Sequence, residues 1–202
     1  MRPAVPDCGP VRATLIVAAL LAALWPASSQ AVTVDALTVT KKGPRYRVDM
    51  QVKLDATAGR AFDVFTHYDN LPRINGAVKQ VRPLPGAAAD AQRLYTQMRL
   101  CFSFFCRSLE QVQDMRATPT ADGGSLSASV VPAQSDLHYG QADWSVGRCA
   151  QGTETCLSFV AELEPKFWIP PLIGPWVMER KLRQEAIQTS EGIERLARAA
   201  AP

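Results

Sequence analysis

The chain has 202 residues, with 22 lysine and arginine residues against 19 aspartate and glutamate residues, and 47% of its residues are hydrophobic. This length and composition suit one globular domain with a sizeable core. The basic residues are scattered and do not alternate with aromatic residues, which argues against a nucleic-acid-binding protein.

Residues 1–31 have the pattern of a secretory signal peptide. Arg2 and Arg12 precede an apolar run from Leu15 to Trp25, and small residues follow at Ser29 and Ala31. The run is shorter than the roughly 20 residues that a membrane-spanning helix needs. We therefore predict cleavage near Ala31 and secretion, with the periplasm as the expected compartment; an uncleaved anchor stays open as the alternative.

The segment after the predicted cleavage site begins with strands and short helices. Residues 32–45 are expected to form an N-terminal arm or an extra strand, and residues 46–200 one ligand-binding domain. Tyr46 to Leu54 alternates between apolar and polar residues, as a half-buried strand does. A helix capped by Asp55 or Thr57 is predicted to end at Thr66. Pro72 begins or interrupts a second short helix that reaches about Ile74.

Six more strand-like runs follow, separated by turns rich in glycine, proline and aspartate. Short connections between consecutive strands predict an antiparallel meander. The runs are Val78–Leu84, Gln92–Cys101, Arg107–Ala117, Ser125–Val131, His138–Val146 and Thr155–Glu164.

A long amphipathic helix is predicted from about Leu172 to Ala199, after a proline-rich approach. Its polar residues are placed off the apolar stripe, and Gly192 is expected to weaken it by up to about 1 kcal/mol. A helix of this length needs a partner for its stripe, and the concave face of the sheet is the expected one. The stripe consists of Met178, Leu182, Ala186, Ile193 and Leu196; the off-stripe residues are Arg180, Lys181, Arg183, Glu191 and Arg195.

Four cysteines remain after the predicted cleavage: Cys101, Cys106, Cys149 and Cys156. An even number in an exported chain indicates disulfides, and three pairings are available. Each sequential pair flanks a predicted hairpin turn, which favours Cys101–Cys106 and Cys149–Cys156, with buried free thiols as the alternative. The spacing does not fit a zinc finger and no histidine lies nearby, so no metal site is predicted. No phosphate loop or dinucleotide fingerprint is present, and no cofactor is predicted.

Three segments carry a resemblance to a known family: Val64–Asn75, Pro132–Asp136 and Phe167–Trp176. With these segments and the order of its elements, the stretch from Tyr46 to Ala197 resembles the START-like, helix-grip superfamily. The resemblance is strongest to the polyketide cyclase and lipid-transport branch, which includes coenzyme Q-binding proteins. The resemblance implies an α+β fold in which a curved antiparallel sheet of about six to seven strands wraps a long C-terminal helix. It also implies an apolar pocket between them.

No catalytic residue is predicted. Ser135, Asp136 and His138 have the residue types of a nucleophile triad, but on an extended segment Ser135 points away from the other two. Ser135 and Asp136 are instead expected to bond to loop backbone. His67 and His138 are the two histidines, and either serves the rival hypothesis of a cyclase or dehydratase that uses a pocket histidine.

The expected ligand-binding residues lie between the short helices, at the tip of one hairpin and around the start of the last helix. Asn70 and Asn75 have helix capping as the alternative. Three phenylalanines at a hairpin tip are costly to hydrate, so contact with a ligand or a membrane surface is expected there, with core packing as the alternative. The expected residues are Tyr68, Asn70, Arg73, Phe102, Phe104, Phe105, Trp144, Phe167, Trp168, Trp176, Met178 and Leu182.

The predicted function is therefore the binding or transport of a hydrophobic small molecule, such as a lipid, isoprenoid or quinone. An enzyme is the less favoured reading, and an envelope interaction protein with a filled pocket is the third. A large cavity with an inward polar group would favour the enzyme, and an all-apolar cavity the carrier.

Overall fold

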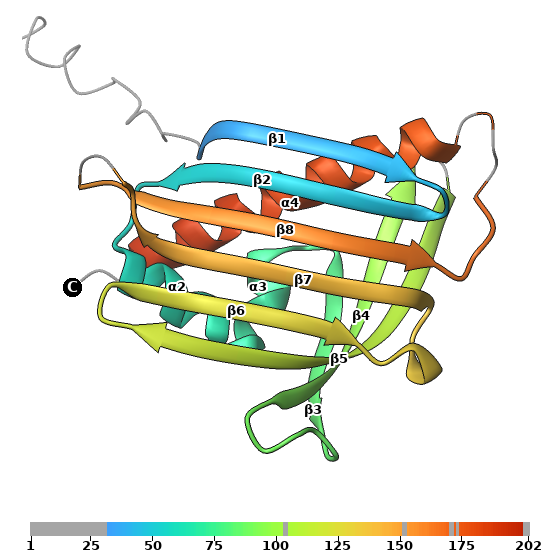
Figure 1. Cartoon of the computed structure of the whole chain (residues 1–202), viewed down its shortest axis with the longest axis horizontal. Coiled ribbons are helices and arrows are strands. Elements are labelled where there is room, and N and C mark those ends of the chain that lie inside the picture. Colours follow the sequence, from blue (N-terminus) through green and yellow to red (C-terminus); the bar gives the residue numbers. More distant parts are fainter. Residues whose placement is uncertain (1–31, 103–104, 151–152, 170–171, 173, 200–202) are drawn as a thin grey trace, which may run out of the picture. The chain divides into compact units, whose positions relative to one another are not determined.

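The computed structural model describes residues 32–102, 105–150, 153–169, 172 and 174–199 (Figure 1). These residues form one eight-stranded antiparallel sheet with helices on one face, in the strand order β1-β2-β8-β7-β6-β5-β4-β3. The strands are β1 (Thr33–Lys42), β2 (Arg45–Leu54), β3 (Val78–Leu84), β4 (Gln92–Phe102), β5 (Phe105–Thr120), β6 (Gly123–Val130), β7 (Leu137–Arg148) and β8 (Thr155–Pro165).

Three helices lie behind the sheet in Figure 1. They are α2 (Ala58–Thr66), α3 (Leu71–Ile74) and α4 (Gly174–Ala199), and two 3-10 turns, Tyr68–Asn70 and Pro132–Gln134, complete the described elements. Among the described residues, no helix combines the length and apolar character that crossing a membrane requires.

The antiparallel sheet and the long final helix confirm the predicted fold class, with one strand more than expected. That strand is β1, which the segment before Tyr46 forms by pairing with β2 from Thr33 to Lys42. Of the two alternatives for this segment, the structure shows the extra strand. Its Val39 is buried against the core, which explains why a polar segment joins the sheet.

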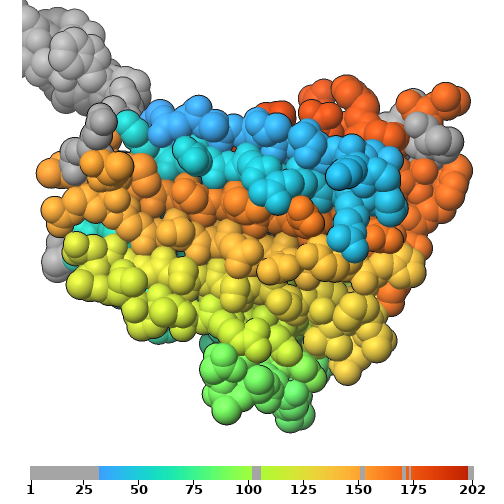
Figure 2. Space-filling view, in the orientation of Figure 1, coloured from blue at the N-terminus to red at the C-terminus, as the bar shows by residue number. Residues whose placement is uncertain are grey.

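The alternation in β2 sets the two faces of the sheet. Its five apolar residues, Tyr46, Val48, Met50, Val52 and Leu54, are all buried on the face that the helices cover. The polar residues between them lie on the outer face, where Arg47 pairs with Asp49 and Glu162. Figure 2 shows this outer face, formed by side-by-side strands.

The C-terminal half of α4 fixes the helix layer. Met178, Ala186 and Ile193 of the predicted stripe are buried, and Leu182 and Leu196 are half-buried. Glu194 accepts a hydrogen bond from the backbone N–H of Asp55 at 2.8 Å, and Arg195 donates to the carbonyl of Arg73 at 2.6 Å. These contacts hold the end of α4 against the segment that precedes α2 and against α3.

Gly192 has a packing role that its low helix propensity does not predict. It is buried where α4 crosses the end of α3, and a Cβ here would lie 2.6 Å from the carbonyl carbon of Ile74 and closer still to its oxygen. Because the two backbones approach this closely, only glycine fits without movement.

The predicted pairing of the four cysteines is confirmed. Cys101 binds Cys106 across the end of the β4–β5 hairpin, where the two residues are directly opposite partners. Cys149 binds Cys156 and joins the end of β7 to the start of β8. Each disulfide therefore closes a local hairpin.

Candidate functional site

The inner face of the central strands carries an aromatic cluster. Trp144 on β7 stacks on Phe159 of β8 with ring centroids 5.0 Å apart, and Phe65 of α2 meets its edge at 5.2 Å. Leu126 and Met50 flank the pair on the neighbouring strands and are buried. Trp144 and Phe159 themselves remain half-buried although they face the helices. Both residues therefore keep some exposed surface, and Trp144 also lines a hollow on the outer face of the sheet.

The next row of the inner face consists of small residues. Ala161, Ala142 and Ala128 lie side by side on β8, β7 and β6, and Met115 of β5 follows in the same row. Ala128 and Ala161 are buried, so neighbouring side chains cover them, whereas Ala142 between them is half-buried. This row and the aromatic cluster together form the apolar floor of the candidate site.

The wall opposite the floor is α4, which packs against β1, β2, α2 and α3. Met178 and Leu182, both predicted to contact a ligand, lie on its inner stripe. Arg183 on the other flank donates a hydrogen bond to the carbonyl of Leu37 at 2.8 Å, which ties the helix to β1.

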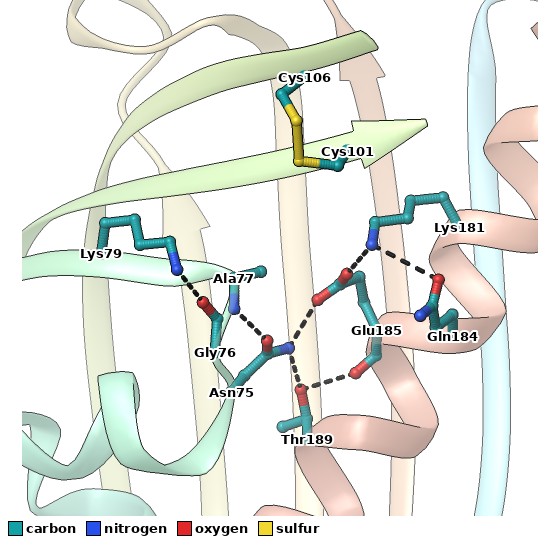
Figure 3. Close-up of polar contacts among 10 residues, drawn as sticks. All are labelled: Asn75, Gly76, Ala77, Lys79, Cys101, Cys106, Lys181, Gln184, Glu185 and Thr189. Atoms are coloured by element: carbon teal, nitrogen blue, oxygen red, sulfur yellow. Dashed lines mark hydrogen bonds and ion pairs between the residues drawn. A yellow bond between two sulfur atoms is a disulfide. The ribbon is translucent and has the colours of Figure 1, made fainter. Parts of the chain in front are cut away.

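A polar cluster lies on the flank of α4 that faces α3 (Figure 3). Lys181 Nζ lies 2.6 Å from Glu185 Oε1, and the amide of Asn75 donates to Glu185 Oε2 at 2.8 Å and to Thr189 Oγ1 at 3.0 Å. Lys181 lies off the apolar stripe, as its spacing predicts, but its side chain is only 14% exposed because the segment that begins at Asn75 covers that flank. The signal was present in the sequence as a Lys–Glu pair four residues apart, each three residues after a stripe residue.

The three candidates between the short helices have mainly structural contacts. Asn70 donates to the carbonyl of Val64 at 3.1 Å and accepts a hydrogen bond from Arg73 at 3.2 Å, so it caps the end of α2. Arg73 is exposed. Tyr68 is half-buried against the core, and burial raises the pKa of its phenol. Of the three, Tyr68 alone contacts the apolar interior.

Aromatic residues gather around the start of α4. Trp168 is 78% exposed, Leu172 95% and Trp176 63%. Phe167 is half-buried, with the guanidinium of Arg107 lying 4.5 Å from its ring centroid. Phe104 and the side chains of Phe102 and Phe105, which were predicted to form the hairpin tip, lie outside the described residues.

The residues considered for catalysis have other roles. Ser135 Oγ accepts a hydrogen bond from the N–H of Val112 at 2.8 Å, and Asp136 accepts one from the N–H of Glu110 at 2.9 Å. Bonding of both side chains to backbone is confirmed, but these partners lie on β5 and not in the loop after Pro132. His67 is exposed, with its Nδ1 2.6 Å from the carbonyl of Asp63, and His138 is exposed on β7.

A shallow hollow of about 300 Å³ lies on the opposite, outer face of β5 to β8. Hydroxyl side chains dominate its surface, with Arg116 and Asp143 at its sides. It is separated from the apolar floor by the thickness of the sheet, so it is not the predicted pocket. Among the described residues, no group of three or more histidine, cysteine, aspartate or glutamate residues has a geometry that would hold a metal ion.

Comparison with known proteins gives one family match and many similar folds. The family model described as "Polyketide cyclase / dehydrase and lipid transport" matches residues 54–186. A search of curated proteins finds no match.

Three solved structures illustrate the similarity of fold. A STAR-related lipid transfer protein from Xanthomonas axonopodis has a TM-score of 0.60 at 14% identity, covering 81% of this chain and 99% of its own. The Zhui aromatase/cyclase from Streptomyces sp. R1128 has a TM-score of 0.59 at 10% identity, covering 76% and 94%. Human STARD10 has a TM-score of 0.58 at 11% identity, covering 81% and 74%. At these identities the similarity establishes the fold alone.

Proposed function

This chain belongs to the polyketide cyclase / dehydrase and lipid transport family, and on that premise we propose that it binds a hydrophobic small molecule between its sheet and α4. The classes of ligand that suit the site are lipids, isoprenoids and quinones. The observation that carries the proposal is the half-buried pair of Trp144 and Phe159 on a face that the helices cover. The ligand-binding domain is assigned to residues 46–200, with β1 as an addition at its edge.

The energetics favour an apolar occupant. Removing apolar surface from water contributes roughly 25 cal/mol per Å², and fully burying one large side chain roughly 1.5–3 kcal/mol. Trp144 and Phe159 keep part of that surface exposed, and Ala142 in the row beside them is also half-buried. A ligand bound against these residues removes their remaining apolar surface from water.

A carrier is favoured over an enzyme by the contacts of the catalytic candidates. Ser135 and Asp136 accept hydrogen bonds from backbone N–H groups, and both histidines are exposed. The similar structures include a protein named for lipid transfer and one named for aromatase/cyclase activity, so the fold itself does not choose. A cyclase or dehydratase remains the second candidate because the polar cluster of Lys181 and Glu185 lies beside the inner stripe of α4.

The ligand proposal is tested by filling the site. Native mass spectrometry of the protein purified from its own envelope, followed by organic extraction, should detect a lipid-like passenger in the wild type. Ala142→Phe places a large side chain on the alanine row and should reduce the passenger at least tenfold. Ser145→Phe, on the outer face of the same strand, is the matched control and should retain it. An empty wild-type protein, or equal passenger in both variants, would contradict the proposal.

We also propose that the protein is exported after cleavage near Ala31. The support is the sequence pattern of residues 1–31 together with two disulfides, which persist in oxidising compartments. N-terminal sequencing of the protein from a periplasmic fraction should begin at Val32. A chain that keeps its first residues and stays in the cytoplasmic fraction would exclude export.

Exposed aromatic residues at the start of α4 support peripheral membrane contact. Trp168, Leu172 and Trp176 form an apolar rim, and Arg180 lies 5.7 Å from the ring of Trp176. Tryptophan and arginine side chains suit the interface between headgroups and acyl chains. Flotation with phosphatidylglycerol-containing vesicles should show bound wild type and at least a threefold loss in Trp168→Ser/Trp176→Ser. Val34→Ser, which replaces another exposed apolar residue, is the control. Equal vesicle binding by the wild type, the double variant and the control would show that the apolar rim does not contribute to membrane binding.

The hairpin phenylalanines are a separate part of the same proposal. Replacing Phe104 and Phe105 with serine should also reduce vesicle or lipid association while the circular dichroism spectrum stays unchanged. Association equal to that of the wild type would reject a role for this tip.

A further inference from the structure

The inference concerns the ion pair between Lys181 and Glu185 on α4, named here the helix ion pair. Its two side chains are 14% and 13% exposed, which makes it the most buried ion pair within the described residues. The next is Arg93–Asp114 on the outer face, at 20% and 19%. The helix ion pair is therefore a charged feature on the flank of α4 that the segment beginning at Asn75 covers.

Surrounding groups hold the carboxylate in one orientation. Asn75 is buried and accepts a hydrogen bond from the N–H of Ala77 at 2.8 Å, while its amide donates to Glu185 and Thr189. Thr189 in turn donates to the backbone carbonyl of Glu185 at 2.8 Å. Glu185 Oε2 thus accepts a hydrogen bond from Asn75, whereas Oε1 has the ion pair with Lys181 but no hydrogen-bond partner within the described residues.

Lys181 keeps donor capacity that none of the described residues uses. A lysine ammonium group has three N–H donors. Within the part of the chain that the structure describes, its polar contacts are Glu185 Oε1 at 2.6 Å and Gln184 Oε1 at 3.5 Å, the second at the limit of a hydrogen bond. At least one N–H is therefore available to an acceptor that enters the interior.

Lys181 lies next to the inner apolar stripe of α4. Lys181 directly precedes Leu182 and lies three residues after Met178, both of which belong to the inner stripe. Figure 3 shows the ammonium group projecting from α4 between the Asn75–Ala77 segment and the end of the β4–β5 hairpin that Cys101 and Cys106 close.

Stability alone does not account for such a pair. Desolvating two charges costs several kcal/mol per ion, and well-packed apolar residues often replace a buried pair without loss. A leucine and a methionine would continue the stripe of α4 at these two positions. A role in recognition explains why charged residues occupy them.

We propose that the helix ion pair is the polar end of the ligand site and that Lys181 donates a hydrogen bond to a neutral oxygen of the ligand. This inference rests on the proposed function and adds the ligand class: a hydrocarbon chain that ends in a carbonyl or hydroxyl group. The pair carries no net charge, and Glu185 lies beside the free donor. A carboxylate or phosphate would therefore meet repulsion that a ketone, quinone or alcohol avoids.

The test uses displacement of a neutral fluorescent probe, N-phenyl-1-naphthylamine, from the purified protein. In the wild type, decan-2-one should displace the probe at about tenfold lower concentration than decanoate does. In Lys181→Met/Glu185→Gln, which removes both charges and leaves no unpaired ion, the probe should still bind within twofold. The half-displacing concentration of decan-2-one should rise about tenfold there, the effect of losing one hydrogen bond to a charged donor.

Two further variants separate recognition from folding. Lys181→Arg keeps a donor beside Glu185 and should retain most of the preference for the ketone. Arg93→Met/Asp114→Asn removes the outer-face pair and should leave ketone binding unchanged.

The outcomes distinguish a failure of the proposed function from a failure of the role proposed for Lys181. A wild type that does not bind the probe overturns the proposed function and the inference with it. Probe binding with equal ketone affinity in the wild type and the double variant overturns the role of Lys181 alone. Stronger displacement by decanoate than by decan-2-one overturns the neutral ligand class.

Discussion

At the close crossing of α4 and α3, helix propensity and packing predict opposite effects of Gly192→Ala on stability. In an isolated helix, Gly192→Ala would stabilise by roughly 1 kcal/mol, because glycine loses more backbone entropy than alanine. In the folded protein the new methyl group would lie 2.6 Å from the carbonyl carbon of Ile74. Ordinary van der Waals contact between carbon atoms requires roughly 3.5–4.0 Å. The two helices must therefore separate by about 1 Å or more.

The expected magnitude follows from these two terms. Overpacking costs typically about 1–3 kcal/mol, and a collision between backbones falls at the upper end because no side-chain rotation relieves it. After subtraction of the propensity gain, we expect Gly192→Ala to lower the free energy of unfolding by about 2 kcal/mol. For a domain of this size that corresponds to a fall of about 4–8 °C in Tm.

Urea unfolding followed by circular dichroism at 222 nm measures the change directly. Gly59→Ala in α2 is the matched control, because a Cβ there meets no atom within 4 Å. This control should gain up to about 1 kcal/mol. If Gly192→Ala proves as stable as the wild type or more stable, the close crossing is not maintained in solution and the reasoning fails.

Two further predictions concern polar contacts on the sheet. Ser135→Ala removes the acceptor 2.8 Å from the N–H of Val112 and should lower the free energy of unfolding by about 1–3 kcal/mol; a loss below 0.5 kcal/mol in urea unfolding would contradict the contact. Hydrogen bonds from Arg93 lower the pKa of Asp114 in the folded protein. The ionised Asp114 therefore stabilises the fold fully above the pKa of the unfolded chain, about 3.9, and this stabilisation is lost as the pH falls through the lower pKa of the folded state. NMR titration of the carboxyl carbon should show this low midpoint and its rise in Arg93→Met, and an unchanged midpoint would refute the pairing.

Residue patterns predict the inner face of this fold well. The alternation from Tyr46 to Leu54 identifies the buried side of β2 because each strand residue has one of two orientations. The spacing of Met178, Ala186 and Ile193 likewise identifies the buried side of α4. Both signals are local, and both are strong because one face of each element is covered along its length.

The spacing of the Lys181–Glu185 pair is a local signal in the sequence, but the burial of this pair is not. Lys181 and Glu185 lie at the edge of the apolar stripe, where burial depends on whether another segment covers the edge. The covering segment begins at Asn75, more than a hundred residues earlier in the chain. Gly192 was misjudged for the same reason, because its role depends on the backbone of Ile74 rather than on its own helix.

The strand order also constrains how the protein folds. Although β2 is among the first elements in the chain, its second neighbour in the sheet is β8, and Tyr46 pairs with Leu163. A nascent chain lacks that partner until almost the whole sequence has been synthesised. Loop closure over this distance is slow compared with the formation of the hairpins from β3 to β7. The first two strands therefore join last, and a chain truncated before Thr155 would leave the apolar side of β2 exposed to aggregation.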